Sequence, residues 1–592
     1  MVTKASPPAQ VKKELPPWQF TADQLIAQFT PGKTPRPQQK YFLEQVAKAF
    51  AAGKRVVVGE LPTGAGKTDA CKTVANALRS AGQQTFMLTS QKLLQDQYTN
   101  EYPSPDIEAL KGRANYSCTH RDAEEGQDAA DGVCRRKSKG ILSECVDDME
   151  AGPIARAADI TVLQAAVSLA LPSSCHRCPY WEQLQKCHDG AISLFNFSSF
   201  LFQQRIGRFP KRALMIVDEA HNCEQQLMSY VTLELSEWTL SLVGIKIERE
   251  IRTKAEFLEW LEETDLVAIV AKKLKDLQDG EGDDFDEDLS AAEKDALEEL
   301  QGKLATFMAF LEKTEWILEV VRYNDKRTGE ERRKIVARPL YAKDFAEDLL
   351  FRHADRLCFM SATILDVGVW ARNLGLSADE VELIRTPCDF PVENRIIWKD
   401  YCGNFGFKYF SREQNPKDPT EPKFVQKVTQ ILENHKGQRG IIHCHSFSLS
   451  KILYQGVETD RFLFQEHFNS KDEMLEEHAR RTDSVIVAPA MHEGLDLKGD
   501  LSRFQVIAKM PWPNMQDRVI KQRMDRDPQW YAWLCALKIV QSYGRSVRSR
   551  DDWATTYLLD AGFEAFLWKN RAMLPDWFHE ALKPGAPKQV RR

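Results

Sequence analysis

The stretch Leu61-Pro62-Thr63-Gly64-Ala65-Gly66-Lys67-Thr68 decides the fold expected for this chain. It follows Arg55–Glu60, a β-branched run typical of a buried strand, and precedes Asp69–Ser80, whose Ala and Leu spacing indicates a helix. Glycines between a strand and a helix let several backbone N–H groups converge on phosphate oxygens. We therefore expect an ATP-binding loop, with Lys67 against the β and γ phosphates and the Thr68 hydroxyl on Mg²⁺. The strict motif has a glycine where this chain has Leu61.

A pair of carboxylates follows a second apolar run, Ala213–Val217. A carboxylate at the C-terminal end of a parallel strand points into the crevice where nucleotides bind. We expect Asp218 to hold Mg²⁺, directly or through water, and Glu219 to polarise the attacking water. The pair opens the run Asp218-Glu219-Ala220-His221, and this run makes the assignment more specific than two acidic residues alone.

Basic residues near the C-terminus complete the predicted nucleotide site. Gln541, Arg545 and Arg548 lie in one short stretch, and the spacing of the arginines predicts that both occupy one face of a helix. Arginine donors stabilise the charge that develops on a γ phosphate, so we expect these three residues to act in hydrolysis. His492–Asp496 follows a predicted strand. We expect this loop to couple ATP hydrolysis to a bound nucleic-acid strand, with Asp496 in the nucleotide site.

Composition limits what the chain can be. Its 592 residues suggest several structural units, and a net charge of −6 means that any nucleic-acid surface must be local rather than global. No apolar stretch approaches the roughly 20 residues that span a bilayer, and the polar N-terminus has no apolar signal core. We expect an intracellular, cytoplasmic protein with no membrane partner.

The order of the predicted elements is α/β. Strands and helices alternate through the first part of the chain, with strands expected at 85–88 and 357–360. They alternate again from about residue 396, with strands expected at 440–444, 484–488 and 504–508. Such alternation predicts two lobes, each with a parallel sheet covered on both faces. Two insertions interrupt the first lobe: a cysteine-rich stretch, and a charged, mostly helical stretch whose acidic run 279–288 we interpret as a solvated loop.

Six of the 13 cysteines fall between residues 118 and 187, and they are Cys118, Cys134, Cys145, Cys175, Cys178 and Cys187. The cytosol keeps thiols reduced, so a disulfide framework is not expected. Four thiolates can hold an iron–sulfur cluster, and the same ligands can hold structural zinc. His120, His176 and His188 could join a zinc site, although ordinary surface histidines are the simpler interpretation.

Several phrases along the chain resemble one known family. These are Arg36-Pro37-Gln38-Gln39, Thr89-Ser90-Gln91, Ser361-Ala362-Thr363, Lys111-Gly112-Arg113-Ala114-Asn115-Tyr116-Ser117-Cys118 and Cys178-Pro179-Tyr180-Trp181. The first three, with the nucleotide motifs, are similar to superfamily 2 helicases. The last two resemble the XPD/DinG (Rad3-like) family of iron–sulfur DNA helicases.

The resemblance implies two RecA-like parallel-sheet motor lobes, with an inserted iron–sulfur cluster domain and a helical arch domain in the first lobe. The expected ranges are a flexible tail at 1–20, first-lobe parts at 21–104, 193–225 and 346–395, a cluster domain at 105–192, an arch at 226–345 and a second lobe at 396–592. The family implies a [4Fe-4S] cluster on Cys118, Cys134, Cys145 and Cys178, with Cys175 and Cys187 as alternates and zinc as the alternative occupant. It also assigns Gln39 to the adenine.

The activity implied is that of an ATP-dependent 5′→3′ helicase, a monomer that moves on single-stranded DNA and opens forked or 5′-tailed duplexes. Such a protein would be nucleoid-associated in a cell. An accessory ATPase with weak unwinding, recruited to a CRISPR effector or repair complex, is the alternative. A non-enzymatic scaffold is disfavoured because Lys67, Glu219 and Arg548 are all present.

DNA contacts are expected from aromatic and basic side chains, because single strands are gripped by charge and by stacking. Candidates are Arg113, Tyr116, Tyr180 and Trp181 near the cysteines, and Trp512 in the second lobe. For each aromatic residue, packing in a core is the competing interpretation.

Overall fold

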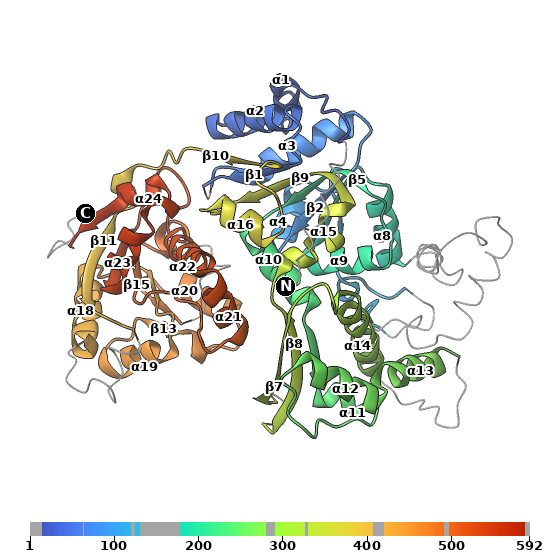
Figure 1. The fold of residues 1–592 in the computed structure, drawn as a ribbon. Coiled ribbons are helices and arrows are strands. Elements are labelled where there is room, and N and C mark those ends of the chain that lie inside the picture. Colours follow the sequence, from blue (N-terminus) through green and yellow to red (C-terminus); the bar gives the residue numbers. More distant parts are fainter. Residues whose placement is uncertain are drawn as a thin grey trace, which may run out of the picture. The chain divides into compact units, whose positions relative to one another are not determined.

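The computed structural model describes residues 15–62, 64–90, 92–119, 125–130, 178–279, 291–325, 329–406, 420–489 and 497–585. The chain divides into two compact units (Figure 1). The first comprises Met1–Gly59, Lys67–Ser361 and Ala371–Ile384, and the second comprises Glu60–Gly66, Ala362–Trp370 and Arg385–Arg592. No helix within the described ranges combines the length and apolarity that crossing a bilayer requires.

A seven-stranded sheet forms the centre of the first unit, in the order β10-β1-β9-β5-β2-β4-β3. The strands are β1 (Val56–Glu60), β2 (Thr85–Thr89), β3 (Glu108–Leu110), β4 (Ile192–Asn196), β5 (Arg212–Val217), β9 (Ala354–Ser361) and β10 (Val381–Arg385). Strands β3, β4, β2, β5 and β9 run parallel. Every residue of β1 and β2 is buried, as a parallel sheet covered on both faces requires. The strands predicted at 55–60, 85–88 and 213–217 are confirmed.

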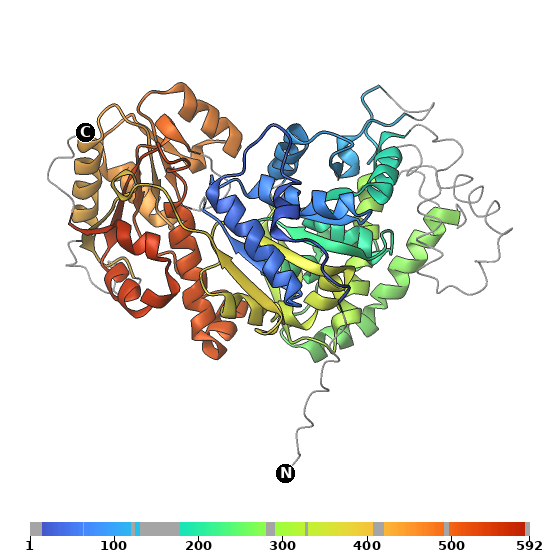
Figure 2. The ribbon, with the colours of Figure 1, turned by 90° about the horizontal axis from the view of Figure 1, so that it is seen from above.

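Helices cover this sheet (Figure 2). They include α1 (Ala22–Ile26), α2 (Pro37–Ala51), α3 (Lys67–Ser80), α4 (Lys92–Glu101), α8 (Pro179–Asp189), α9 (Phe197–Arg205) and α16 (Val367–Asn373). Helix α2 begins at a proline, which lacks the N–H that a first turn leaves unpaired. Helix α3 contacts α1 and α2 as well as β2 and β5, so the helix that follows the phosphate loop is held from several sides.

The insertion after β5 is a mixed α/β layer. Its helices are α10 (Cys223–Val231), α11 (Glu237–Ser241), α12 (Lys254–Thr264), α13 (Leu266–Asp279) and α14 (Ala291–Phe310). Helices α11 to α14 share a core, which includes Phe257, Trp260 and Phe307, with the antiparallel strands β6 (Leu233–Ser236), β7 (Trp316–Asn324) and β8 (Glu331–Pro339). Helix α10 contacts β8 and α14. The helical period dominates this stretch, and the expected helical arch therefore omitted its three-stranded sheet.

A second seven-stranded sheet, in the order β13-β14-β12-β15-β16-β11-β17, forms the centre of the second unit. Its strands are β11 (Ile397–Gly403), β12 (Gly440–His443), β13 (Phe462–Phe464), β14 (Val485–Ala488), β15 (Phe504–Ile507), β16 (Thr555–Asp560) and β17 (Leu582–Pro584). All neighbouring pairs are parallel. The strands predicted at 440–444, 484–488 and 504–508 are confirmed, and two parallel-sheet lobes are the observed fold.

The helices of the second unit are α18 (Thr420–Asn434), α19 (Phe447–Gly456), α20 (Lys471–Arg480), α21 (Arg518–Arg526), α22 (Pro528–Tyr543), α23 (Gly562–Lys569) and α24 (Asp576–Ala581). Asp527 begins α22 by accepting a hydrogen bond from the backbone N–H of Trp530 at 3.0 Å. Helix α22 contacts β15, and it leads into the stretch that carries the predicted arginines.

Candidate active site

Asp218 lies where the buried strand β5 ends, in the first unit. Its side chain is 5% exposed. Oδ1 accepts a hydrogen bond from the backbone N–H of Glu219 at 2.9 Å, and Oδ2 accepts one from the Tyr98 hydroxyl at 3.1 Å. Burial and the charge of Glu219 raise the pKa of Asp218, while the charge of Lys67 lowers it. A nearby cation therefore stabilises the charged form of this carboxylate.

Glu219 has an uncommon backbone conformation. Its φ of 51° and ψ of 47° place it in the left-handed region, which costs a non-glycine residue about 1–2 kcal/mol. The Glu219 carboxylate lies 3.4 Å from Nδ1 of His221, and that ring nitrogen lies 2.8 Å from the Ser361 hydroxyl. The structure thus joins the predicted Asp-Glu-Ala-His and Ser-Ala-Thr motifs through one histidine.

The phosphate loop shows the backbone geometry that its glycines predict. Gly64 and Gly66 have φ values of 80° and 78°, in the region that a residue with a Cβ rarely adopts. Helix α3 begins at Lys67, so its unpaired N–H groups face the loop. Thr63 lies outside the described residues.

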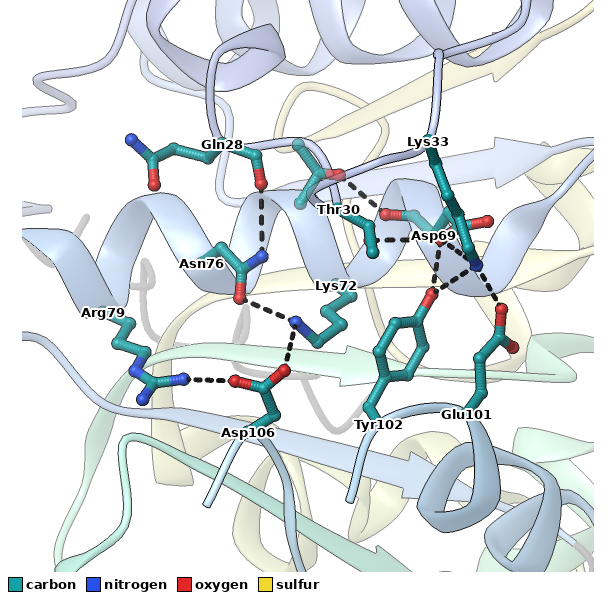
Figure 3. A network of polar contacts seen from close by, with 11 residues as sticks. Gln28, Thr30, Lys33, Asp69, Lys72, Asn76, Arg79, Glu101, Tyr102 and Asp106 are labelled. Carbon is teal, nitrogen blue, oxygen red and sulfur yellow. Dashed lines mark hydrogen bonds and ion pairs between the residues drawn. The ribbon is translucent and has the colours of Figure 1, made fainter. Parts of the chain in front are cut away.

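A polar network fixes α3 from its outer side (Figure 3). Asp69 accepts hydrogen bonds from Thr30 at 3.1 Å, from Lys33 at 2.9 Å and from the Tyr102 hydroxyl. Lys33 also pairs with Glu101. Burial lowers the pKa of Lys33, but its bonds to Glu101 and Asp69 outweigh that effect and raise it. The network ties the chain before α2, and the end of α4, to the first turn of the helix that carries Lys67.

The same network continues along α3. Asn76 donates to the Gln28 carbonyl at 3.1 Å, and Asp106 accepts from Arg79 at 3.1 Å and lies 3.5 Å from Lys72. Figure 3 shows Lys72, Asn76 and Arg79 along the helix, with Gln28 and Asp106 on neighbouring segments. Two turns of α3 are therefore fastened to neighbouring segments, which keeps the phosphate-loop helix in place.

Gln39, the predicted adenine contact, lies in the first turn of α2 and is buried. Its side-chain oxygen accepts a hydrogen bond from the Arg36 backbone N–H at 2.8 Å. The side-chain amide is therefore held at the start of α2, and its role toward the adenine stays a prediction.

The predicted helix placement of Arg545 and Arg548 is wrong. Helix α22 ends at Tyr543 and Gly544 caps it, so Gln541 is helical while both arginines lie in the loop that follows. The sequence pattern continued the helical spacing through a glycine that instead ends the helix.

Side chains from β15, from the residues just before it and from Asp552 fix the loop that carries Arg545 and Arg548. The Ser546 hydroxyl contacts the Ser502 hydroxyl at 2.7 Å and donates to Gln505 at 3.1 Å. Asp552 accepts from the Arg548 backbone N–H at 3.2 Å and pairs with Arg503 at 3.0 Å. These buried contacts give the loop a defined path without helical hydrogen bonds.

Glu60, a residue that the sequence did not single out, precedes the phosphate loop. Its buried carboxylate accepts from the backbone N–H groups of Ile364 at 3.1 Å and Leu365 at 2.9 Å. Trp533 of α22 donates to the Ile364 carbonyl at 2.8 Å. These residues all belong to the second unit, in which the chain after the Ser-Ala-Thr triplet is therefore anchored to α22. An acidic residue at a strand end gave no sequence signal for this role.

Three of the candidate cluster cysteines are described, namely Cys118, Cys178 and Cys187. Tyr116 and Tyr180 are in edge contact with ring centroids 5.7 Å apart, and Arg113 lies over the Tyr180 ring at 4.9 Å. Cys118 and Cys178 each lie two residues from this contact, so it brings their two chain segments together. Cys178 also occupies the N-cap position of α8, where the helix dipole favours a negatively charged ligand. Both residues fit the predicted cluster.

Cys187 has different surroundings. It is fully buried on α8, and its thiol donates to the Glu108 carbonyl at 3.4 Å. Burial raises the pKa of this thiol to about 12, which disfavours the thiolate that metal binding needs. Cys134, Cys145 and Cys175 lie outside the described residues. Within the described part of the chain, no group of three or more Cys, His, Asp or Glu side chains has metal-site geometry.

Two family models match separate parts of the chain. Residues 427–581 match the helicase C-terminal domain, and residues 32–148 match the type III restriction enzyme res subunit. The first match covers most of the second sheet, and the second covers the phosphate loop.

Curated relatives match over most of the chain. The ATP-dependent DNA helicase YoaA of Escherichia coli is 23% identical, with 91% of this chain and 93% of the relative covered. The YoaA protein of Haemophilus influenzae is 24% identical over 86% of each chain.

Solved structures share the fold. An XPD helicase matches 93% of this chain and 99% of its own with a TM-score of 0.59 and 14% identity. Xpd4 of S. tokodaii covers 93% of this chain and 100% of its own, with a TM-score of 0.54 and 14% identity.

Two parallel-sheet lobes, a phosphate loop and an Asp-Glu-Ala-His strand end define an ATP-hydrolysing superfamily 2 helicase. Within that class, these relatives and structural neighbours support the predicted resemblance to the XPD/DinG (Rad3-like) family.

Proposed function

We propose that this helicase moves 5′→3′ along single-stranded DNA and uses ATP hydrolysis to separate duplexes. Its DNA substrate is supported by the two YoaA relatives, which are named ATP-dependent DNA helicases. The polarity rests on the resemblance to the XPD/DinG family. The observation that carries the proposal is the contact of His221 with both Glu219 and Ser361, because it ties the predicted hydrolytic carboxylate to the motif expected to communicate with DNA.

The nucleotide chemistry follows from the phosphate loop, the start of α3 and the end of β5. Thr68 and Asp218 would hold Mg²⁺, and Lys67 would neutralise the β and γ phosphates. Glu219 would polarise the attacking water, since its carboxylate is partly exposed while that of Asp218 is buried. Glycine-rich backbone at Gly64 and Gly66 leaves room for the phosphates themselves.

Residues of the second unit would complete the site when ATP is bound. Gln541 is 8% exposed, and no described residue hydrogen-bonds its Nε2 atom, so this donor is available for a ligand. Arg545 and Arg548 would stabilise charge on the γ phosphate, and a fixed loop suits that task because it needs little rearrangement. Asp496, in the proposed coupling loop, lies outside the described residues.

A [4Fe-4S] cluster on Cys118, Cys134, Cys145 and Cys178 is part of the proposal. The closeness of the Cys118 and Cys178 segments is common to both possible ligand sets, and the burial of the Cys187 thiol favours the set without Cys187. The bound cluster would supply structural cross-linking of a stretch with little core of its own, and zinc is the alternative occupant.

Forked and 5′-tailed duplexes are the proposed substrates, and a monomer is the proposed working form. The proposed binding to DNA supports the expected cytoplasmic, nucleoid-associated location. Separation of a 5′-tailed duplex by the wild-type protein, with ATP and Mg²⁺, tests the proposal.

Trp512 is the aromatic residue best placed to stack on a DNA base. It is 45% exposed in the loop after β15, and one ring face stacks on Tyr531 with centroids 5.4 Å apart and an interplanar angle of 7°. The Phe566 ring forms an edge contact with the Trp512 ring, with centroids 5.3 Å apart. By contrast, Tyr180 is only 4% exposed and packs against Tyr116, which favours a structural role.

Trp512→Ala is expected to raise the single-stranded DNA concentration for half-maximal ATPase stimulation about tenfold, because stacking contributes about 1–3 kcal/mol per base. ATPase without DNA should stay at the wild-type rate. The matched control is Trp568→Ala on α23, which removes a tryptophan that is 84% exposed. Equal DNA requirements for the two variants would contradict a special role for Trp512.

A further inference from the structure

The four residues Thr30-Pro31-Gly32-Lys33 form a tight turn between α1 and α2. The backbone N–H of Lys33 donates to the Thr30 carbonyl at 3.1 Å, and Gly32 has a φ of 81°. Such a turn favours proline at its second position and glycine at its third, because proline presets a negative φ and glycine tolerates a positive one. The local sequence therefore specifies this turn.

Both ends of the turn bind one carboxylate oxygen of α3. The Thr30 hydroxyl donates to Oδ1 of Asp69 at 3.1 Å, and Nζ of Lys33 donates to the same oxygen at 2.9 Å. The first and fourth residues of a tight turn lie close together, so a single acceptor can bind both side chains. Figure 3 shows the two side chains converging on Asp69. Since Asp69 lies in the first turn of α3, the chain before α2 is tied to the start of the phosphate-loop helix.

Two further contacts extend this connection. Asn76, about two turns further along α3, donates to the Gln28 carbonyl at 3.1 Å. Lys33 also pairs with Glu101 at the end of α4. The Lys33 side chain is 40% exposed, so each ion pair alone contributes little, but all of these contacts restrain one short segment. We call this segment, Gln28–Lys33, the brace.

The brace connects the two ends of the proposed nucleotide site. Arg36 lies three residues after Lys33 and is the N-cap residue of α2, and with it begins the Arg36–Gln39 motif proposed for the adenine. A proline on each side of Arg36 restricts the backbone of this short link. At the other end, Asp69 lies two residues after Lys67, which is proposed to bind the phosphates. A displacement of the brace would therefore change the spacing between the base-binding and the phosphate-binding residues.

We propose that the brace sets the base selectivity of this ATPase, because it fixes the adenine-binding end of the site relative to the phosphate-binding end. Thr30 and Lys33 are positioning residues, since their side chains act through Asp69. The inference rests on the proposed roles of Gln39 toward the adenine and of Lys67 toward the phosphates. When the brace is released, the start of α2 can shift relative to α3. The base then loses its contacts, while α3 and the phosphate loop keep theirs.

The double variant Thr30→Val/Lys33→Met removes both donors and nearly keeps the size of each side chain. We expect kcat/KM for ATP to fall about tenfold, as for the loss of one hydrogen bond to a charged group, while kcat/KM for GTP stays at the wild-type value. The preference for ATP over GTP should therefore narrow by the same factor. Tripolyphosphate, which has no base, is the second probe. Its inhibition constant against ATP, and kcat at saturating ATP, should match those of the wild type.

Arg79→Met is the matched control. The Arg79 side chain is 39% exposed, close to the 40% of Lys33, and it pairs with Asp106 at 3.1 Å near the far end of the same helix. Asp106 lies between α4 and β3 rather than on the chain that leads to α2. This variant should keep the wild-type preference for ATP over GTP.

Two results for the double variant would overturn the role of the brace in base selectivity. One is an unchanged preference for ATP over GTP. The other is an equal loss of kcat/KM for ATP and GTP with weaker inhibition by tripolyphosphate, which would show that the brace only supports the phosphate loop.

Gln39→Ala separates this inference from the proposal beneath it. If Gln39→Ala and the double variant both narrow the preference for ATP over GTP, the role of the brace is supported. If Gln39→Ala narrows it and the double variant does not, the inference alone fails. If Gln39→Ala leaves the preference unchanged, the proposed adenine role fails, and the inference fails with it.

Discussion

Glu219→Gln is expected to bind ATP normally and to hydrolyse it about 100- to 1,000-fold more slowly, because general-base catalysis contributes about that much. The amide has the size of the carboxylate but cannot polarise a water as a negative group does. The left-handed backbone at this position does not distinguish Gln from Glu, so the local fold should persist. Steady-state ATPase assays with DNA, beside fluorescent ATP binding, measure the two effects separately.

Glu382→Gln is the control for that experiment. Glu382 lies on β10, is 46% exposed and pairs with Lys54 at 3.8 Å, a surface ion pair of little energetic weight. Its ATPase rate should equal that of the wild type. Hydrolysis by Glu219→Gln within threefold of wild type would show that another group activates the water.

Cys118→Ser is expected to lose the iron–sulfur cluster and with it strand separation, while part of the DNA-stimulated ATPase activity remains. A serine hydroxyl is a poor substitute for one of four thiolates. Lys67 begins α3, and Asp218 and Glu219 follow β5, whereas Cys118 lies in the chain after β3. ATP turnover should therefore persist when the cluster is lost. Iron content, visible absorbance, ATPase rate and unwinding on one preparation measure all of this.

Cys187→Ser distinguishes the two possible ligand sets. A serine there can still donate to the Glu108 carbonyl that the thiol contacts, so the variant should fold and keep its iron. Iron loss equal to that of Cys118→Ser would favour the set with Cys175 and Cys187. Full unwinding by Cys118→Ser would instead show that the cluster is dispensable.

The core of the fold could be predicted because its signals are local. The strand expected at 85–88 is observed at Thr85–Thr89, and the one expected at 357–360 extends over Ala354–Ser361. Each of these strands contains a short apolar run that ends at a hydroxyl residue, Thr89 in the first and Ser361 in the second. The C-terminal end of α22 was harder to predict from the sequence. The helix ends before Gly544, and contacts from Gln505 and Asp552 hold the loop that follows. Gln505 lies 41 residues from its partner Ser546, a separation that no local pattern indicates.

The residues of the candidate site likewise divide into those that the sequence predicts and those that only the fold reveals. Lys67, Asp218 and Glu219 sit in recognisable phrases at the ends of strands. Tyr98 and Glu60 do not, since their roles appear only when the fold brings Tyr98 to Asp218, 120 residues away, and Glu60 to Ile364, 304 residues away. Long-range pairing of this kind has no periodicity or spacing that a single sequence could reveal.

Strand separation on matched 5′- and 3′-tailed duplexes tests the proposed 5′→3′ helicase most directly. With ATP and Mg²⁺, the wild-type protein should separate the 5′-tailed duplex and leave the 3′-tailed duplex intact, and Lys67→Ala, which lacks the phosphate-binding charge, should separate neither. Separation of the 3′-tailed duplex alone would contradict the polarity. Active DNA-stimulated ATPase without separation of either duplex would contradict the helicase and favour an accessory ATPase.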